Sequence, residues 1–194
     1  MISENILKFY INGEWVTPLG AERLGVENPA TEEIVAKVAL GSVADADRAV
    51  MAARAAFASF TLTPVAERIA LLERVLAEYN ARAEDFAQAM RIEMGAPITW
   101  ARDSQFWAGQ VHLESTIAAA KAFHWEEARG ATRIIREGIG VCALITPWNW
   151  PMNQIVCKVA PAIAAGCTMV LKPSEIAPLS ALLWAEVCHA AGVP

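Results

Sequence analysis

The residues best suited to do chemistry lie in two short segments near the end of the chain. Residues 146–151, TPWNWP, contain Asn149, and Lys172 and Glu175 follow about twenty residues later. A neutral carboxamide can donate an N–H to a developing alkoxide and stabilise it by about 3 kcal/mol without changing its own protonation state. A carboxylate in the second segment is what a strand-helix-strand unit uses to bind ribose hydroxyls, and Lys172 can donate to the same hydroxyls. This spacing indicates cofactor chemistry.

Each of these residues also has a structural interpretation. Asn149 stands just before a helix that opens with Pro151, and the local sequence supports an N-cap or an Asx turn as well as it supports an oxyanion donor. Lys172 and Glu175 would equally suit a solvated ion pair that caps the following helix. Without the Asn149 loop beside them, Lys172 and Glu175 would be better explained as such an ion pair than as a ribose site.

The elements that must position these residues follow from hydrophobic patterning. Residues 140–145 form a continuous apolar run of strand length, typical of a parallel strand buried on both faces. A helix over about 151–166 and a second buried strand over 168–171 complete a predicted βαβ unit. A further helix over 178–191 begins the next crossover.

The glycine-rich loop of ordinary dinucleotide-binding units is missing here. Such units carry G-x-G-x-x-G between the first strand and its helix, so that backbone amides approach the pyrophosphate. Residues 146–151 occupy that position in this chain, and Gly138 and Gly140 precede the strand as turn glycines. The loop at the carboxyl end of a parallel strand remains the expected place for a ligand.

The first part of the chain is predicted to hold short strands followed by helices. Residues 9–16 flank an Asn-Gly dipeptide, which is the strongest short hairpin signal, and residues 33–38 are typical of another short strand. Ser42 and Asp45 form a capping-box pattern that predicts a helix over about 44–57.

Further helices follow this one. Thr63 and Pro64 predict the start of a second helix, with the threonine as its cap and the proline at its first position. Helical periodicity continues over 82–93, stops at Gly95 and resumes over about 98–121. The predicted buried faces contain Ala46, Ala49, Val50, Ala53 and Phe57 in the first helix and Ile69, Leu72, Val75, Leu76 and Tyr79 in the second.

These patterns divide the chain into three parts. Residues 1–122 hold the N-terminal hairpin and the helices, and residues 138–194 hold the βαβ unit. Between them, residues 123–137 change to a period of two around Arg129 and Gly130, which predicts an extended hairpin.

Composition argues against several classes of function. The chain has 194 residues, a net charge of −5 and no cluster of Lys or Arg, so we expect no nucleic acid and no anionic membrane surface as a partner. Its four cysteines and three histidines lack the spacing of metal ligands or disulfides, so we expect no metal site. Without a signal-peptide core or an uninterrupted apolar run long enough to span a bilayer, the chain is expected to be cytoplasmic.

Seven short motifs, in this order and spacing, resemble the aldehyde dehydrogenase superfamily over essentially the whole chain. They are INGEW at 11–15, NPAT at 28–31, EMGAP at 93–97, TPWNWP at 146–151, KVAPA at 158–162, AGCT at 165–168 and LKPSE at 171–175. The resemblance implies an α/β fold, the first half of a Rossmann-like cofactor-binding domain with preceding helices. It also implies that residues 123–137 are the oligomerisation arm of a homo-oligomer, a dimer or a tetramer.

The resemblance implies roles for individual residues in oxidising an aldehyde to a carboxylic acid, through a cysteine thiohemiacetal and thioester. Asn149 matches the family's oxyanion asparagine, and Lys158 matches a lysine near the catalytic end of the cofactor. The implied cofactor contacts are Ile145, Thr146, Pro147, Trp148, Lys172, Ser174 and Glu175, and the implied substrate-tunnel residues, on one helical face, are Trp150, Gln154 and Cys157. Glu175 favours NAD over NADP, because a carboxylate repels a ribose 2′-phosphate, although Lys172 partly offsets that repulsion.

Departures from the family pattern limit what the chain is expected to do. The family's nucleophilic cysteine, general-base glutamate and pyrophosphate-facing glycine pair belong to the part that should follow Pro194, so we expect this chain alone to be inactive. Cys157 is equally well explained as a small buried hydrophobe. Glu32 stands where the family often has a turn glycine, and we expect no functional effect. The alternatives are a non-catalytic module that binds nucleotide or a sister subunit, and a purely structural oligomerisation partner.

Overall fold

The structure is a computed structural model that describes residues 3–194. Its first elements are two small antiparallel sheets. Strands β1 (Phe9–Ile11) and β2 (Glu14–Val16) form the predicted hairpin. Its Asn12-Gly13 turn has φ values of 56° and 75°, the left-handed conformation that this dipeptide tolerates. The hairpin prediction is confirmed.

The second sheet contains a strand that the sequence did not predict. Strand β3 (Arg23–Asn28) pairs with β4 (Glu33–Ala39), and only the second of these was expected. Strand β3 carries charged residues at two positions, Gly25 in its middle and a register shift after Val26, so its period-two pattern is weak. In the turn between the strands Glu32 has a φ of 58°, which gives a physical reason why a glycine suits that position.

Helix α1 (Val43–Phe60) begins as predicted, with a reciprocal capping box. The Ser42 amide donates to Asp45 Oδ2 over 2.9 Å, and the Asp45 amide donates to Ser42 Oγ over 3.3 Å. Ala53 is buried, and its carbonyl accepts a 2.7 Å hydrogen bond from Thr168 Oγ1. The predictions for Ala46 and Val50 are wrong, since both side chains are exposed. The face of α1 that contains Ala53 packs instead against the later strand at residues 168–172.

Helices α2 (Val65–Ala81) and α3 (Ala83–Met94) follow. The predicted cap of α2 is wrong, because Pro64 is the N-cap residue and Thr63 makes no capping bond. The ψ of Pro64 is 145°, an extended value, and its carbonyl accepts the first helical bonds from Glu67 and Arg68. The predicted end of α3 is confirmed, with Gly95 in the left-handed conformation.

The predicted helix over 98–121 is interrupted by a π-helical segment. It consists of α4 (Ile98–Trp100), the π segment η1 (Ala101–Phe106) and α5 (Trp107–Ala122). The buried Tyr79 hydroxyl donates to the Phe106 carbonyl over 3.0 Å, and the two rings stack with their centroids 4.4 Å apart. A π turn shifts the hydrogen-bond register and leaves a carbonyl available for such a bond, which apolar periodicity does not reveal.

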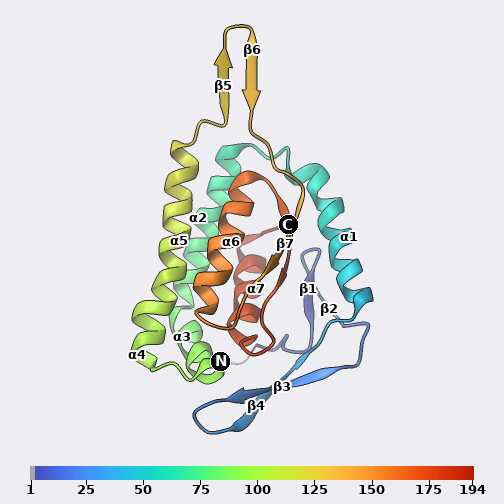
Figure 1. Ribbon diagram of the computed structural model, residues 1–194, viewed down its shortest axis with the longest axis vertical. Coiled ribbons are helices and arrows are strands. Elements are labelled where there is room, and N and C mark those ends of the chain that lie inside the picture. The colour runs from blue at the N-terminus through green and yellow to red at the C-terminus, as the bar shows by residue number, and fades with distance from the viewer. Residues whose placement is uncertain (1–2) are drawn as a thin grey trace.

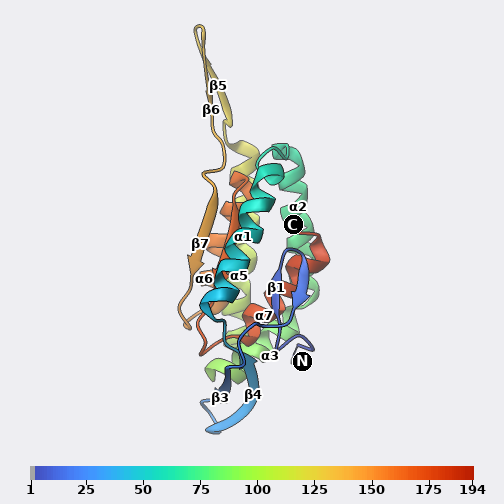
Figure 2. The same cartoon turned by 90° about the vertical axis from the view of Figure 1, so that its right-hand side faces the viewer.

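The predicted extended hairpin is confirmed. Strands β5 (Glu126–Arg129) and β6 (Thr132–Ile135) pair on either side of Gly130, whose φ is 60°. The hairpin projects beyond the rest of the molecule in two perpendicular views (Figures 1 and 2). Its root is fixed, because Trp125 Nε1 donates to the Ala120 carbonyl over 3.0 Å and the Arg136 amide donates to the Trp125 carbonyl over 3.0 Å.

The predicted βαβ unit is also confirmed. It consists of β7 (Val141–Ile145), α6 (Pro151–Ala165) and β8 (Thr168–Lys172), and α7 (Leu179–Ala191) follows it. The two strands are parallel and in register along their whole length. Together with the helices around them they form an α/β fold (Figure 1).

Strand β7 is not buried on both faces, contrary to the prediction. Ala143 and Ile145 alternate along one face and are exposed, and 71% of Ile145 is accessible to solvent. Within residues 3–194 this sheet has two strands, and although α1 and α6 contact them, that face stays uncovered. Figure 2 shows β7 on the outer side of the molecule.

The core lies among α2, α3, α5, α6 and α7, with Tyr79 near its centre. Its ring lies 4.7 Å from that of Phe86 and 5.8 Å from that of Trp184, centroid to centroid. The fully buried apolar side chains around it include Leu72, Val75, Met90, Leu113, Met152 and Ile155. This packing holds α6 of the βαβ unit, and α7 after it, against the helical layer.

Candidate active site and cofactor site

The loop between β7 and α6 carries the first group of predicted site residues. Thr146 is buried, and its amide donates to the Lys172 carbonyl over 3.2 Å, which extends the pairing of the two parallel strands. Trp150 is the N-cap residue of α6 and has a φ of 53°. A left-handed conformation is uncommon for a bulky residue, and such conformations cluster at functional sites. The Trp150 ring meets the Trp100 ring edge to face at 6.3 Å between centroids.

The side chain of Asn149 is exposed in this loop. Its structural interpretation is wrong, because Trp150 is the N-cap residue and α6 has no side-chain capping bond. Within residues 3–194 no partner accepts or donates a hydrogen bond at the Asn149 carboxamide. Both its N–H groups are therefore available to a ligand.

Helix α6 brings together Gln154, Cys157 and Lys158. The Lys158 ammonium donates to the Gln154 backbone carbonyl over 3.1 Å and to Gln154 Oε1 over 3.2 Å. It also lies 3.7 Å from Cys157 Sγ. Of the three residues predicted to share a helical face, Gln154 and Cys157 lie in α6, whereas Trp150 is its N-cap residue with a left-handed backbone. The Trp150 carbonyl accepts the Gln154 amide over 3.0 Å.

The turn after β8 carries the second group. Lys172 Nζ and Glu175 Oε2 are 2.6 Å apart, and the two side chains are 62% and 49% exposed. The hydrogen bond from Lys172 lowers the pKa of Glu175. Within this turn Ser174 Oγ accepts a 3.3 Å hydrogen bond from the Ile176 amide. The ion pair of the structural interpretation is thus present, with both partners open to solvent.

The Lys172 and Glu175 pair does not cap the next helix, however. Pro178 is the N-cap residue of α7 and supplies no side-chain bond. The first amides of α7 donate instead to Glu93, near the end of α3. Glu93 opens the EMGAP motif, but the sequence assigned it no role, because its burial and its contact with α7 depend on tertiary packing.

The two groups meet at one edge of the parallel sheet. Ile145 pairs with Lys172 in the strand register, so both loops leave the sheet at its carboxyl ends. Around them Ile145, Trp148 and Ile176 expose large apolar side chains. An apolar surface beside a carboxylate, an ammonium and an unpartnered carboxamide fits a ligand with flat rings and hydroxyl groups.

The four cysteines are free thiols, and two of them have a raised pKa. Burial raises the pKa of Cys188 to about 12. Burial and the neighbouring Cys167 raise the pKa of Cys142. Since the thiolate is the reactive form, neither Cys142 nor Cys188 is activated.

Within residues 3–194 no cluster of three or more His, Cys, Asp or Glu side chains is arranged to hold a metal ion. No helix in that range is both long and apolar enough to cross a membrane.

Comparison with known proteins agrees with this geometry. Residues 15–194 match the aldehyde dehydrogenase family. The chain is 50% identical over 188 residues to a 3-succinoylsemialdehyde-pyridine dehydrogenase of a Pseudomonas species, a match that covers 96% of this chain and 39% of that protein.

Solved structures give the same result. A cysteine-to-alanine mutant of aldehyde dehydrogenase C from Pseudomonas syringae, in complex with NAD+ and octanal, is 51% identical with a TM-score of 0.97, covering 100% of this chain and 40% of that one. An aldehyde dehydrogenase from Bartonella henselae is 47% identical with a TM-score of 0.94, covering 97% of this chain and 40% of that one. The chain spans about 40% of the length of these relatives, and it belongs to the aldehyde dehydrogenase family.

Proposed function

We propose that this chain acts as the N-terminal part of an NAD-dependent aldehyde dehydrogenase, which oxidises an aldehyde to a carboxylic acid through a cysteine thioester. The observation that carries the proposal is the meeting of the Asn149 loop and the Lys172 to Glu175 turn at the carboxyl edge of β7 and β8. The chain would supply the ribose site and the oxyanion donor. The nucleophile and the general base would come from the remaining length of the family fold, so the chain alone is expected to be inactive.

The cofactor is proposed to lie across this edge. Lys172 and Glu175 would bind the adenosine ribose hydroxyls, one as donor and the other as acceptor, while Ile145 and Trp148 supply exposed apolar surface. Thr146, Pro147 and Ser174 would complete the contacts. When bound, NAD would accept the hydride that leaves the substrate. Glu175 favours NAD, because its carboxylate would repel the 2′-phosphate of NADP.

Asn149 is proposed to donate a hydrogen bond to the oxyanion that forms when a thiolate attacks the aldehyde carbon. Its carboxamide is exposed and makes no bond to the described residues, so nothing in them competes for its N–H groups. The positive φ of Trp150 directs the chain into α6 just after Asn149. A donor held at this loop would require little reorganisation during the reaction.

Lys158, Gln154 and Cys157 are proposed to line the adjoining substrate and cofactor space, with Trp150 at its rim. Lys158 would place a positive charge near the proposed reaction site, and its two hydrogen bonds to Gln154 restrict its position. Cys157 donates weakly to the Gln154 carbonyl over 3.5 Å and would act as a wall residue. The projecting hairpin of β5 and β6 is proposed to contact a second copy of the protein.

The oxyanion role is tested by Asn149→Ala in the full-length enzyme. We expect kcat to fall about a hundredfold or more with little change in the Kd of NAD, because the lost N–H acts mainly on the transition state. Asn80→Ala is the matched control, since Asn80 is exposed on α2, and its kcat should stay within about twofold. An Asn149→Ala enzyme with normal kcat would remove Asn149 from this role.

A further inference from the structure

The buried carboxylate of Glu93 connects helix α3 to the start of α7, which follows the proposed ribose-binding turn. Glu93 lies at the end of α3 and is 2% exposed. Its Oε1 accepts the Ser180 amide over 3.1 Å and also the Ser180 hydroxyl, and its Oε2 accepts the Leu179 amide. All three donors belong to the first two residues of α7. Both oxygens of one side chain are therefore committed to the start of a distant helix.

Helix α7 has no cap of its own. Pro178 occupies the N-cap position and makes no side-chain bond, so the first amides of the helix would otherwise be buried without partners. A carboxylate suits this place, since it accepts two N–H groups and lies at the positive end of the helix dipole. Glu93 thus replaces a local cap with one that is 86 and 87 residues away in the sequence.

This contact limits where the proposed ribose turn can lie. Residues 173–178 join β8 to α7 and include Ser174 and Glu175. At the β8 end the turn is held by the hydrogen bond from the Thr146 amide to the Lys172 carbonyl. At the α7 end it is held by Glu93. A connection this short, anchored at both ends and containing two prolines, has little freedom to move Glu175.

We infer that Glu93 is a positioning residue for the nucleotide site, which fixes the start of α7 and through it the turn that receives the adenosine ribose. The inference rests on the proposed function of that turn. Glu93 does not touch the cofactor; it determines where Lys172 and Glu175 are presented. If the start of α7 were less firmly held, these side chains would no longer be prearranged for the ribose. NAD binding would then carry the free-energy cost of ordering them, and the affinity would fall.

The test is Glu93→Gln in the full-length enzyme, which keeps the size of the side chain but turns an amide N–H toward the α7 donors. We expect the Kd and KM of NAD to rise about tenfold, with kcat at saturating NAD close to that of the wild type. Hydrogen exchange should increase at residues 173–180. Glu84→Gln is the matched control, because it makes the same change at an exposed position of α3, and it should leave NAD binding and exchange unchanged.

Ser180→Ala provides a second variant in case Glu93→Gln does not fold, since it removes only the hydroxyl donor and leaves both amides of α7 bound to Glu93. Its Kd for NAD should rise by a smaller factor, about threefold. A lower Tm together with an unchanged Kd and unchanged exchange at 173–180 would show a purely structural role and overturn the inference alone. A wild-type enzyme that binds no NAD would overturn the proposed function and this inference with it.

Discussion

At the proposed cofactor site, single side chains at the edge of the parallel sheet would decide between NAD and NADP. Glu175 is exposed, and its carboxylate is kept ionised by the hydrogen bond from Lys172, which lowers its pKa. A cofactor with free ribose hydroxyls can donate to this carboxylate, whereas a 2′-phosphate would meet a negative charge. Lys172 would act in the opposite direction, so in the proposed site the balance between the two residues would set the preference.

Glu175→Gln tests this balance. The ratio of kcat/KM for NAD to that for NADP should fall at least about tenfold, because the repulsion disappears while the Lys172 ammonium remains. Parallel steady-state measurements with both cofactors would show it. Glu114→Gln, an exposed glutamate on α5, should leave the ratio unaltered. If the two glutamate variants had the same ratio, Glu175 would have no part in cofactor choice.

Among the structural elements, the helices differ in where their caps come from. Helix α1 is capped by its own sequence through Ser42 and Asp45, whereas α7 is capped by Glu93 of α3. Asp45 also accepts a 2.8 Å hydrogen bond from the Leu19 amide, which ties the segment after β2 to α1. Burial alone would raise the pKa of Asp45, but the hydrogen bonds from Leu19 and Ser42 outweigh it and lower the pKa to about 2.

Asp45→Asn should lower the free energy of unfolding by about 1–2 kcal/mol at neutral pH, through the loss of the cap and of a charged acceptor. Because the folded pKa is below the unfolded value, the stabilisation from ionised Asp45 is present above about pH 4 and is lost as the pH falls toward 2. Urea denaturation at several pH values should therefore show the variant and the wild type converging in acid. Asp47→Asn, a change at an exposed position of the same helix, should lower the free energy of unfolding little at any pH. A difference between Asp45→Asn and the wild type that stayed constant with pH would contradict a stabilising role for ionised Asp45.

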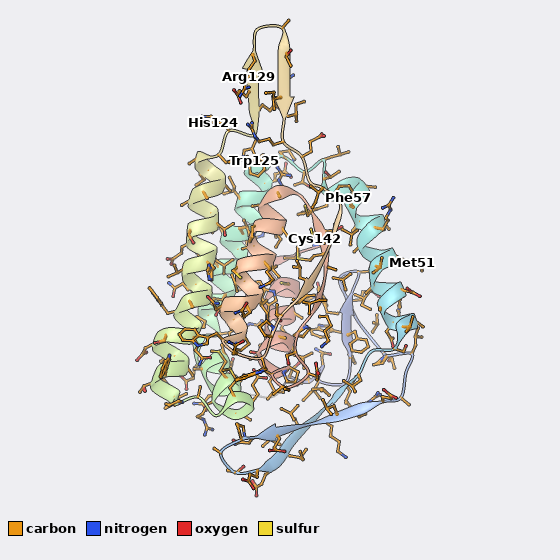
Figure 3. The ribbon with its side chains drawn as sticks, in the orientation of Figure 1. Met51, Phe57, His124, Trp125, Arg129 and Cys142 are labelled. Atoms are coloured by element: carbon orange, nitrogen blue, oxygen red, sulfur yellow. The ribbon has the colours of Figure 1, made fainter. Side chains whose placement is uncertain are left out.

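At the scale of the whole molecule, the hairpin of β5 and β6 projects beyond the other elements that the structure describes (Figure 1). Figure 3 shows Arg129 well out along it and His124 and Trp125 at its root. The root is stiffened by the hydrogen bonds of Trp125 and by the Arg68 guanidinium, which lies 5.1 Å from the Trp125 ring centroid. The strands expose apolar side chains such as Ile135. Each strand also has one edge without a partner strand among the described residues, and such edges readily pair with another chain.

Replacing residues 126–135 with a short glycine-containing turn should reduce the oligomeric state of the full-length enzyme. The expected result is a smaller mass in light scattering, because the proposed contact between copies is lost while the anchored root remains. Arg133→Ala is the control, since it removes only an exposed ion pair with Glu126 and leaves the strand pairing intact. An unchanged mass in the shortened variant would exclude the hairpin as the main contact.

The sequence by itself determined those features whose cause lies within a few residues. The Asn12-Gly13 turn, the capping box of α1 and the strand-helix-strand unit are examples, because turn conformation, caps and hydrophobic periods are local. The TPWNWP and LKPSE segments belong with them, since a parallel unit brings its two carboxyl-end loops to one edge whatever surrounds it.

Tertiary structure decided what depends on residues that are distant in the chain. It buried Glu93 under α7, placed a π turn where Tyr79 meets Phe106, and left one face of β7 open. Gly109 shows the physical reason most directly. In the middle of α5 it resembles a weak point, but an added Cβ would collide with the Tyr79 hydroxyl. Only the packing of two helices against each other gives that position its meaning, because close packing depends on atoms that the local sequence does not contain.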